Sequence, residues 1–405
     1  MFTEFPPQRS VAKARLSAFL PDAGRTYAAR RNFDLPEAPS VSALSPWVRH
    51  RVLTEAEVAG AVLGVHTPQA ADKYLQELCW RAYWKGWLER RPAIWAQYRQ
   101  GVQAGLNRIA TETGLRSDWE AACAGTTGID GFDQWAQQLV ETGWLHNHAR
   151  MWFASIWVFT LKLPWELGAD FFLRHLIDGD PASNTLGWRW VAGLHTPGKT
   201  YLAKAANISE FTGGRFNPVG LATEAVALRE RAHPAPRPPP VSQSWDPNGR
   251  TGLLLTEEDL SPDFLFDAGL RPQATAMYRA TADRSPLSVA PRVGNWVQAA
   301  MGDCGARWSD RLGWLSPVHE GEAGLLFLRD WALSEGLTQV VTPYAPIGPV
   351  AEHLVMLDRL LAPQGVRLVR VMRDWDATAW PRATHGFFQF RDVIPHLIAP
   401  LTRRR

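Results

Sequence analysis

The chain of 405 residues is long enough for two or three domains that each bury their own core. Apolar residues make up 46% of it and charged residues 20%, which excludes an intrinsically disordered protein. The formal net charge of +3 fits an acidic partner but does not require one. Composition alone therefore indicates a globular protein of more than one domain and leaves its function open.

Neither a membrane span nor an export signal is evident. The longest apolar run, Met151–Leu161, is too short to cross a bilayer and is closed by Lys162. The N-terminus lacks the apolar stretch of a secretory signal. The three cysteines, Cys79, Cys123 and Cys304, are too few for a four-thiolate metal cluster. We therefore expect free thiols, no metal site and a cytoplasmic location.

Tryptophan is unusually frequent, with 20 residues, most of them in the first half of the chain. The majority must form cores or anchor surfaces, because large aromatic side chains dominate apolar burial. A few have the chemistry to hold a flat aromatic ligand or to carry electrons. Composition leaves these two roles open.

Helical periodicity dominates residues 10–215. The pair Ser45-Pro46 predicts a helix start, with the serine as cap and the proline in the first turn. Further helices are predicted for Asp72–Leu88, Phe132–Val140, Leu145–Leu161 and Glu166–Leu176. Residues 1–235 are therefore expected to form a helical domain.

A proline-rich linker is predicted for residues 236–250. Beyond it, strand-like runs alternate with amphipathic helices, which is typical of a parallel α/β sheet. The predicted strands are Gly252–Thr256, Ala274–Arg279, Gln339–Pro343 and Val366–Met372, and the predicted helices are Glu322–Ser334 and Pro349–Leu361. Residues 251–405 are thus expected to be a smaller, Rossmann-like domain, so the chain as a whole is mainly α. No glycine-rich phosphate-binding motif supports a nucleotide site in it.

Four segments of the helical part carry candidate functional residues. They are Val-Ser-Ala-Leu-Ser-Pro at 41–46, Tyr-Leu-Gln-Glu-Leu-Cys-Trp-Arg at 74–81, Thr-Gly-Trp-Leu-His-Asn-His-Ala-Arg-Met at 142–151 and Leu-Ile-Asp-Gly-Asp-Pro-Ala-Ser-Asn-Thr-Leu-Gly-Trp-Arg-Trp at 176–190. Ser42 and Ser45 suit a diphosphate at a helix start, although plain capping explains them equally well. Asp178 and Asp180 are able to cap a helix, and Arg150 is expected to pair with Asp178.

Glu77, Trp80 and Arg81 are predicted to share one helix face, because they are spaced three and four residues apart. A surface ion pair with a tryptophan packed beneath it accounts for such a face as well as a binding site does. The spacing by itself does not decide between the two.

Together these segments resemble the FAD-binding domain of the DNA photolyase and cryptochrome family, over roughly residues 25–220. The resemblance implies that FAD binds non-covalently, with Asn184 facing the N5 atom of the flavin and Asp180 its polar edge. The residues that match the family's FAD-binding positions are Tyr27, Ser42, Leu44, Ser45, Tyr74, Arg81, Asn147, Arg150, Asp178, Asp180, Asn184 and Trp188. A second, antenna chromophore is left open.

The resemblance also implies a pocket for a flipped-out pyrimidine dimer, which reduced flavin splits by light-driven electron transfer. Glu77, Trp80, Asn147, Met151 and Trp190 match the residues of that pocket. Asn147 and Met151 favour cyclobutane dimers, since the members that repair (6-4) photoproducts carry histidines there. The partner is then UV-damaged DNA, single-stranded or locally opened, and the chain is expected to act as a monomer.

Trp188 and Trp165 match the inner and middle members of the family's tryptophan relay to the surface. The outer member is not found, because Ile109–Leu115 holds no tryptophan; Trp119 is the nearest in sequence. Its presence is explained as well by ordinary packing.

Four positions depart from the family pattern: Val41, Tyr74, Ala82 and His148, the last in place of a phosphate-binding arginine. The family's α/β antenna domain normally precedes the helical domain, whereas here an α/β pattern follows it. Circular permutation and an unrelated appended domain both explain this order. The resemblance therefore allows a repair enzyme, a cryptochrome-like photosensor without repair activity, and an FAD-binding remnant that does not respond to light.

Overall fold

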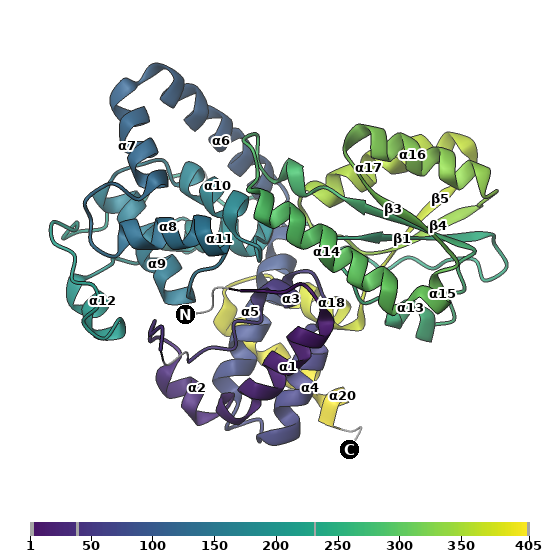
Figure 1. Ribbon diagram of the computed structural model, residues 1–405, viewed down its shortest axis with the longest axis horizontal. Coiled ribbons are helices and arrows are strands. Elements are labelled where there is room, and N and C mark those ends of the chain that lie inside the picture. Colours follow the sequence, from purple (N-terminus) through teal and green to yellow (C-terminus); the bar gives the residue numbers. More distant parts are fainter. Residues whose placement is uncertain (1–3, 38–39, 231, 403–405) are drawn as a thin grey trace.

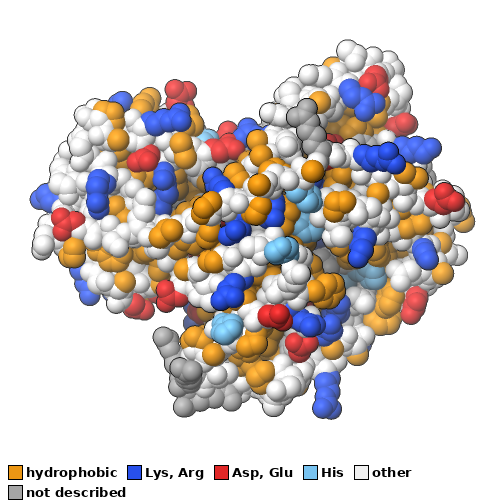
Figure 2. Space-filling model, turned by 180° about the vertical axis from the view of Figure 1, so that it is seen from behind, with side chains coloured by type: hydrophobic (Ala, Val, Ile, Leu, Met, Phe, Trp, Pro, Cys, Tyr) orange, Lys and Arg blue, Asp and Glu red, His pale blue; other side chains and the backbone are white. Residues whose placement is uncertain are grey.

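The computed structural model describes residues 4–37, 40–230 and 232–402. Helices from the first half of the chain and a sheet from the second half lie side by side, and the last helices return to the first ones (Figure 1). Seen from behind, the molecule is notched between two upper lobes, and histidine side chains gather near the middle of this face among hydrophobic and basic ones (Figure 2). No helix in the described ranges is long and apolar enough to cross a membrane.

The helical part agrees with the predicted elements to within a few residues. Its α-helices are α1 (Arg9–Phe19), α2 (Arg25–Arg30), α3 (Ser45–Arg49), α4 (Glu55–Val65), α5 (Asp72–Glu89), α6 (Ala93–Thr111), α7 (Thr113–Ala124), α8 (Phe132–Thr142), α9 (Asn147–Ser155), α10 (Trp165–His175), α11 (Pro181–Val191) and α12 (Ala205–Phe211). A π-helical turn, Ile156–Thr160, extends α9. The predicted start of α3 was one residue off, because Leu44 and not Ser45 holds the cap position.

Local sequence signals explain where two of these helices begin. Thr54 accepts a hydrogen bond from the backbone N–H of Glu57, and the Glu57 carboxylate accepts one from the N–H of Thr54, which forms a complete capping box for α4. Asp180 caps α11 by accepting from Ser183 N, with Pro181 in the first turn. The prediction that this aspartate caps a helix is confirmed.

The second half contains a five-stranded parallel sheet in the order β3-β2-β1-β4-β5. The strands are β1 (Thr251–Thr256), β2 (Ala274–Arg279), β3 (Trp314–Glu320), β4 (Gln339–Pro343) and β5 (Arg367–Val371). Four of them were predicted. The missed strand, β3, lies at the sheet edge and contains Pro317, and proline is tolerated in a strand only where its missing N–H is not needed.

Helices cover both faces of this sheet, as a parallel sheet requires. Leu254 contributes to a core with the helices α16 (Gly321–Ser334) and α17 (Pro349–Leu361). The flanking Leu253 and Leu255 belong to the main core, which also contains the buried face of α14 (Pro291–Arg307) and the helical part. The alternation follows from the two-residue period of a strand.

The end of the chain does not stay with the sheet. After β5, the helices α18 (Asp374–Ala379), α19 (Phe387–Phe390) and α20 (Ile394–Thr402) contact α4 and α5. Residues 374–402, which we predicted within the domain 251–405, therefore share a core with the helical part. The described residues from 232 to 246 form neither helix nor strand, and Arg237 ties them to the end of α5 through the carbonyl groups of Glu89 and Arg90.

Buried ion pairs join the helical part to the sheet and to the end of the chain. Arg49 makes a bidentate pair with Glu258 at 2.5 and 2.7 Å. Arg51 pairs with Asp376 at 2.7 Å and with Asp259 at 3.3 Å. Each of these side chains is at most 5% exposed. Because an unpaired buried charge is strongly destabilising, each side of this junction needs the other.

We predict that a fragment of residues 1–235 does not fold cooperatively, because Arg49 and Arg51 lose Glu258, Asp259 and Asp376. Thermal melting followed by circular dichroism should show a broad, low-temperature transition for the fragment and a sharp one for the full chain. As a control, a full chain cut at a protease site inserted within 238–240 should remain one particle in size-exclusion chromatography. A sharp melt of the isolated fragment would contradict the prediction.

Candidate functional site

The structure brings the four candidate segments together. The third segment leads into α9 and the fourth into α11, and α11 packs against both α5 and α9. The first segment joins them through two hydrogen bonds: Tyr74 Oη donates to Ser42 Oγ at 3.2 Å, and Trp144 Nε1 donates to Ser45 Oγ at 3.2 Å. Residues more than a hundred positions apart thus surround one region of the helical part.

Arg150 and Asp178 form the predicted ion pair. Arg150 Nη2 lies 2.8 Å from Asp178 Oδ2, and Arg150 Nε donates to the carbonyl of Leu145, which fixes the guanidinium plane. The second carboxylate oxygen, Asp178 Oδ1, is buried and has no partner among the described residues. A buried acceptor without a donor is costly, so this oxygen marks a place where a ligand N–H fits.

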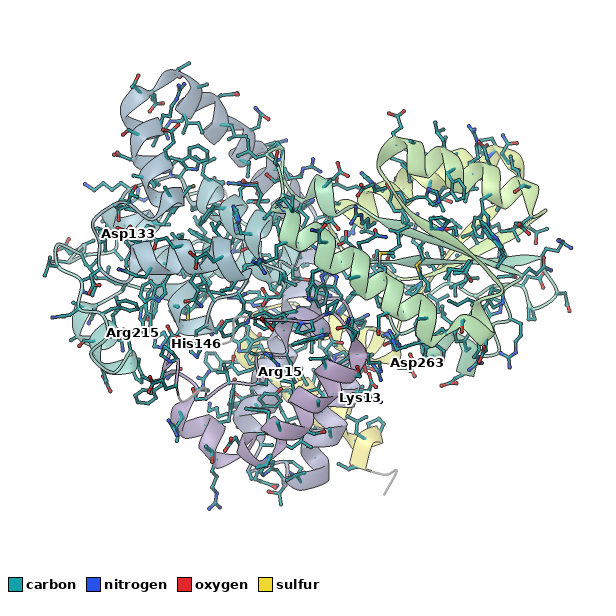
Figure 3. The ribbon with its side chains drawn as sticks, in the orientation of Figure 1. Lys13, Arg15, Asp133, His146, Arg215 and Asp263 are labelled. Carbon is teal, nitrogen blue, oxygen red and sulfur yellow. The ribbon has the colours of Figure 1, made fainter. Side chains whose placement is uncertain are left out.

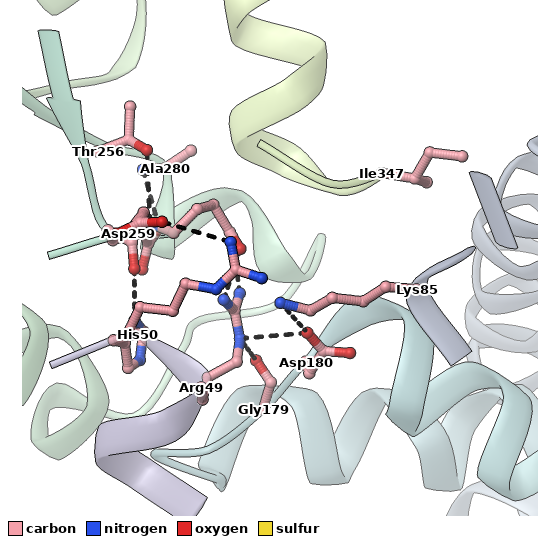
Figure 4. A network of polar contacts seen from close by, with 12 residues as sticks. Arg49, His50, Lys85, Gly179, Asp180, Thr256, Asp259, Ala280 and Ile347 are labelled. Carbon is pink, nitrogen blue, oxygen red and sulfur yellow. Dashed lines mark hydrogen bonds and ion pairs between the residues drawn. The ribbon is translucent and has the colours of Figure 1, made fainter. Parts of the chain in front are cut away.

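Asp180 sits between two buried cations, Lys85 from α5 and Arg49 from α3 (Figure 4). Burial alone would raise the pKa of Asp180, but Lys85 Nζ at 3.6 Å and Arg49 Nε at 3.7 Å hold it well below its ordinary value. The carboxylate is therefore ionised at neutral pH. Both cations lie beyond hydrogen-bond distance of Asp180 Oδ2, which leaves that oxygen able to accept a bond from a ligand.

Asn184 is buried on α11, where its Nδ2 donates to the carbonyl of Ala169 at 2.7 Å. This bond fixes which way the amide oxygen points. On the same helix, a Cβ added to Gly187 would meet no atom within 4 Å. Open space beside a glycine in the middle of a helix leaves room for a flat group against α11.

The two serines predicted to bind the diphosphate are held in place by hydrogen bonds and still have hydroxyl hydrogens to donate. The hydroxyl groups of Ser42 and Ser45 each accept one hydrogen bond, so their hydrogens remain available to a phosphate oxygen. Ala43, between them, has a left-handed backbone with φ of 48°. Such strain in a residue other than glycine is concentrated at functional loops, and no motif in the sequence predicted it here.

Tyr27 and Leu44, the remaining apolar members of the predicted cofactor set, are both buried. The ring of Tyr27 meets that of Tyr74 edge to face, with centroids 5.0 Å apart. These two tyrosines therefore close the core beneath the serines.

The predicted dimer-binding residues are all at least partly accessible: Asn147 is exposed, and Glu77, Trp80, Met151 and Trp190 are half-buried. The predicted cofactor set is mixed. Asp178, Asp180, Asn184 and Trp188 are buried, whereas Ser42, Ser45, Arg81 and Arg150 are half-buried and Asn147 belongs to both sets. The deepest polar groups of the region are therefore those predicted for the flavin.

Glu77 and the two tryptophans have partners that sequence reasoning missed. Glu77 pairs with Arg31 of the segment after α2 at 2.6 Å, and burial raises the pKa of Glu77 although Arg31 opposes the shift. The Trp80 ring stacks on Phe387, with centroids 3.7 Å apart and planes 9° apart. Trp190 stacks on Tyr201 at 5.7 Å. Only the ring of Trp80 is thereby covered by the end of the chain.

The two histidines beside Asn147 are structural. His148 is buried, donates from Nδ1 to the carbonyl of Asn32, accepts at Nε2 from Tyr201 Oη, and stacks on Trp152 with centroids 4.0 Å apart. Burial lowers the pKa of His148, so it does not substitute for the phosphate-binding arginine of the family pattern. Burial also lowers the pKa of His146 to about 3, with Arg215 among the nearby cations (Figure 3).

The site also contains three cationic groups that the sequence motifs did not indicate as a set: Arg49, Arg81 and Lys85. Arg81 Nη1 is buried without a partner among the described residues, so it offers a donor where Asp178 and Asp180 offer acceptors. The one sequence signal for Lys85 was its place four residues after Arg81, inside the otherwise apolar run Ala82–Leu88. This mixture of donors and acceptors fits the edge of an isoalloxazine ring, which carries both kinds of group.

The predicted relay residues are not direct ring neighbours. Trp188 contacts Trp157, with centroids 6.1 Å apart, and Gly168 makes room for it, since a Cβ there would lie 2.3 Å from the Trp188 ring. Trp165 instead contacts Tyr98 at 5.8 Å. Trp157 is thus a neighbour of Trp188 that the family pattern did not indicate.

A cleft of about 880 Å³ lies elsewhere, between the start of α4, residues 242–247, the end of β5 and α20. None of the predicted site residues lines it. We therefore place the candidate site on the chemistry of the converging side chains and not on this cleft.

Comparison with known proteins supports the same region. A family profile described as the FAD binding domain of DNA photolyase matches residues 74–221. The chain is similar to two proteins named deoxyribodipyrimidine photo-lyase. The one from Vibrio cholerae is 29% identical over 221 residues, covering 52% of this chain and 44% of that protein. The one from Escherichia coli is 31% identical over 210 residues, covering 49% and 42%.

The chain thus spans less than half the length of these relatives. Among solved structures, a bacterial class III photolyase from Agrobacterium tumefaciens aligns at 25% identity with a TM-score of 0.43, over 51% of this chain and 43% of that one. A cryptochrome from Synechocystis aligns at 22% identity with a TM-score of 0.38, over 50% and 43%.

We predict that Asp180→Asn lowers the FAD content of the purified protein and its stability, because Lys85 and Arg49 lose a neutralising charge. Breaking a buried ion pair costs about 3–5 kcal/mol. Flavin absorbance per protein and chemical unfolding measure the two effects. Asp133→Asn is the matched control. Asp133 lies on α8, away from the site, and accepts hydrogen bonds from the backbone N–H groups of Thr127 and Gly128. Full flavin content in Asp180→Asn would show that this carboxylate does not contact the cofactor.

Proposed function

We propose that this chain, whose residues 74–221 belong to the FAD-binding domain family of DNA photolyases, is a blue-light-dependent lyase that splits cyclobutane pyrimidine dimers in DNA. The observation that carries the proposal is the difference in burial within the site. The buried groups of Asp178, Asp180 and Asn184 suit a flavin edge, and half-buried aromatic and carboxyl groups from the same segments are open to a second ligand. A protein that only stored a cofactor would have no need of these accessible groups.

In this proposal the buried polar residues hold and orient FAD. Asp180 and Asp178 accept from the ring edge, and the carbonyl of Asn184 is aimed by its bond to Ala169. When bound in reduced form, FAD supplies the electron that opens the cyclobutane. Because this reaction would consume no electron overall, the side chains of this protein would have to provide neither a net reductant nor a covalent nucleophile.

The accessible residues receive an extruded dimer. Trp80 and Trp190 offer half-buried rings for stacking on its bases. Arg31 holds the carboxyl group of Glu77 in place, and this group would hydrogen-bond an extruded base. Asn147 and Met151 carry no titratable proton. This suits a reaction in which only an electron moves and no acid is required at those positions.

A cryptochrome-like photosensor is the second candidate, and two observations favour it. His148 is buried where a phosphate-binding arginine is expected, and Phe387 covers one face of Trp80. A single assay separates the candidates. Reduced protein is illuminated with a dimer-containing oligonucleotide, and the remaining dimers are counted by chromatography. Light-dependent loss of dimers supports the lyase. No loss of dimers, together with photoreduction of the flavin in a parallel sample of oxidised protein, supports the sensor.

We also propose that the sheet-containing part is an antenna-type domain in permuted order. It has the expected parallel sheet, and the chain leaves it through α18 to α20, which join the core of the helical part. An unrelated appended domain would not be expected to complete that core. FAD is the one cofactor we assign, and a second chromophore is not assigned.

We predict that Glu77→Ala and Trp80→Ala impair dimer splitting far more than flavin binding. Loss of a stacked aromatic costs about 1–3 kcal/mol of base affinity, so binding of a dimer-containing strand should weaken by roughly 5- to 150-fold in Trp80→Ala. Fluorescence anisotropy measures the affinity, and absorbance measures the flavin. Trp314→Ala, at an exposed tryptophan on β3, is the control. Native repair rates in both site variants would mean that the dimer binds elsewhere.

We predict that Trp188→Phe and Trp165→Phe each slow light-driven reduction of the bound flavin, with flavin content unchanged, because phenylalanine keeps the packing but is far harder to oxidise. Time-resolved absorption after a blue flash measures this. Trp157→Phe belongs in the same series, since Trp157 is the tryptophan that contacts Trp188. If only Trp188→Phe and Trp157→Phe slow the reaction, the route leads through Trp157 and the role of Trp165 is refuted.

A further inference from the structure

Phe388, on α19 near the end of the chain, is conspicuously exposed. Its side chain is 81% exposed, compared with 53% for Trp314, the other strongly exposed phenylalanine or tryptophan among the described residues. Single exposed apolar residues are common on proteins, so exposure alone carries little. The surroundings of Phe388 give it more weight.

The backbone around Phe388 is held firmly against α5. Tyr83 Oη donates to the carbonyl of His385 at 2.8 Å, and Arg91 Nη2 donates to the carbonyl of Thr384 at 2.8 Å. On the other side, the ring of Phe390 is buried and lies 5.4 Å from that of Tyr83. Phe388 is thus presented on an anchored turn and not on a loose tail.

This turn lies next to the proposed dimer pocket. Phe387, the residue before Phe388, stacks on Trp80 with centroids 3.7 Å apart, and Trp80 in turn lies 5.0 Å from Trp84. Both tryptophans are half-buried. The Cα atom of Phe388 lies about 3.8 Å from that of Phe387, whose ring stacks on Trp80. Phe388 is therefore close enough to this stack to contact a neighbouring nucleotide. We call Trp80, Trp84, Phe387 and Phe388 the aromatic edge.

The charges around the aromatic edge are mainly positive. Arg382, His385 and Arg391 are exposed on the same segment, and Asp392 is the exposed carboxylate beside them. Neither Arg382 nor Arg391 forms an ion pair with any residue in the described ranges. Arginines without an ion-pair partner beside an exposed aromatic ring, here that of Phe388, are a combination that binds single-stranded nucleic acid.

We propose that residues 382–391 are a DNA-contacting element of the proposed lyase. Phe388 stacks on the nucleotide that flanks the extruded dimer, and Arg382 and Arg391 contact the phosphates on either side. The element rests on the proposed function, and it adds a partner contact from outside the matched residues 74–221. An apolar side chain that fills the gap beside an extruded base lowers the cost of unstacking, which is how wedge residues act in other DNA-binding proteins.

The test uses the full chain with FAD bound and single-stranded oligonucleotides with and without one cyclobutane dimer. Phe388→Ala should weaken binding of the dimer-containing strand by roughly 5- to 150-fold, as expected for one lost base stack, and Phe388→Trp should restore it. Arg382→Ala/Arg391→Ala should reduce the slope of log affinity against log salt by about 1.4, since each phosphate contact contributes about 0.7 on a single strand. Leu333→Ala, at an exposed leucine on α16, is the control.

Flavin content and melting temperature show that each variant is folded. If the native protein binds the dimer-containing strand and Phe388→Ala binds it equally well, this inference is overturned while the dimer pocket stands. If the native protein has no preference for the dimer-containing strand, the proposed function itself fails. If Phe388→Ala changes self-association in ultracentrifugation but not DNA affinity, the surface serves a second copy of the chain, and the inference is likewise overturned.

Discussion

The burial of three cations, Arg49, Arg51 and Lys85, is the constraint on which the rest of this structure depends. Each is at most 2% exposed, and a charge in such a place is tolerated only when opposite charges meet it. Their partners come from distant parts of the chain: Asp180 before α11, Glu258 and Asp259 after β1, and Asp376 on α18. Arg51 even adopts a left-handed backbone, with φ of 50°, to reach them. The helical part and the sheet-containing part are therefore joined by buried ion pairs as well as by a shared apolar core.

The same network reaches the candidate site. Arg49 contacts Glu258 of the sheet-containing part and lies 3.7 Å from Asp180, the carboxylate assigned to the flavin edge. Without the sheet, Arg49 would lose Glu258 and keep Asp180 as its carboxylate partner. A closer pairing with Arg49 would then draw the Asp180 side chain away from a ligand. The sheet-containing part thus holds Arg49 in place and, through Arg49, acts on Asp180, one of the proposed cofactor residues.

Aromatic packing adds a second link between the two ends of the chain. Trp80, on the helix that carries the first strong motif, stacks on Phe387 from the C-terminal helices. Tyr83 and Arg91 hold the intervening turn by hydrogen bonds to its carbonyl groups. The surroundings of Trp80 are consequently built from both halves of the sequence, although the family resemblance ends near residue 220.

The sequence by itself determined the helices with strong periodicity, four of the five strands, and local pairs such as the Asp180 cap and the Arg150–Asp178 ion pair, because these follow from spacing and from matching motifs. It did not reveal β3, whose edge position lets it contain Pro317. Nor did it reveal the Arg31–Glu77 pair or the Phe387–Trp80 stack. Only the tertiary structure decided these contacts, because an ion pair or a ring stack depends on distances of a few ångströms between residues that the chain order leaves far apart.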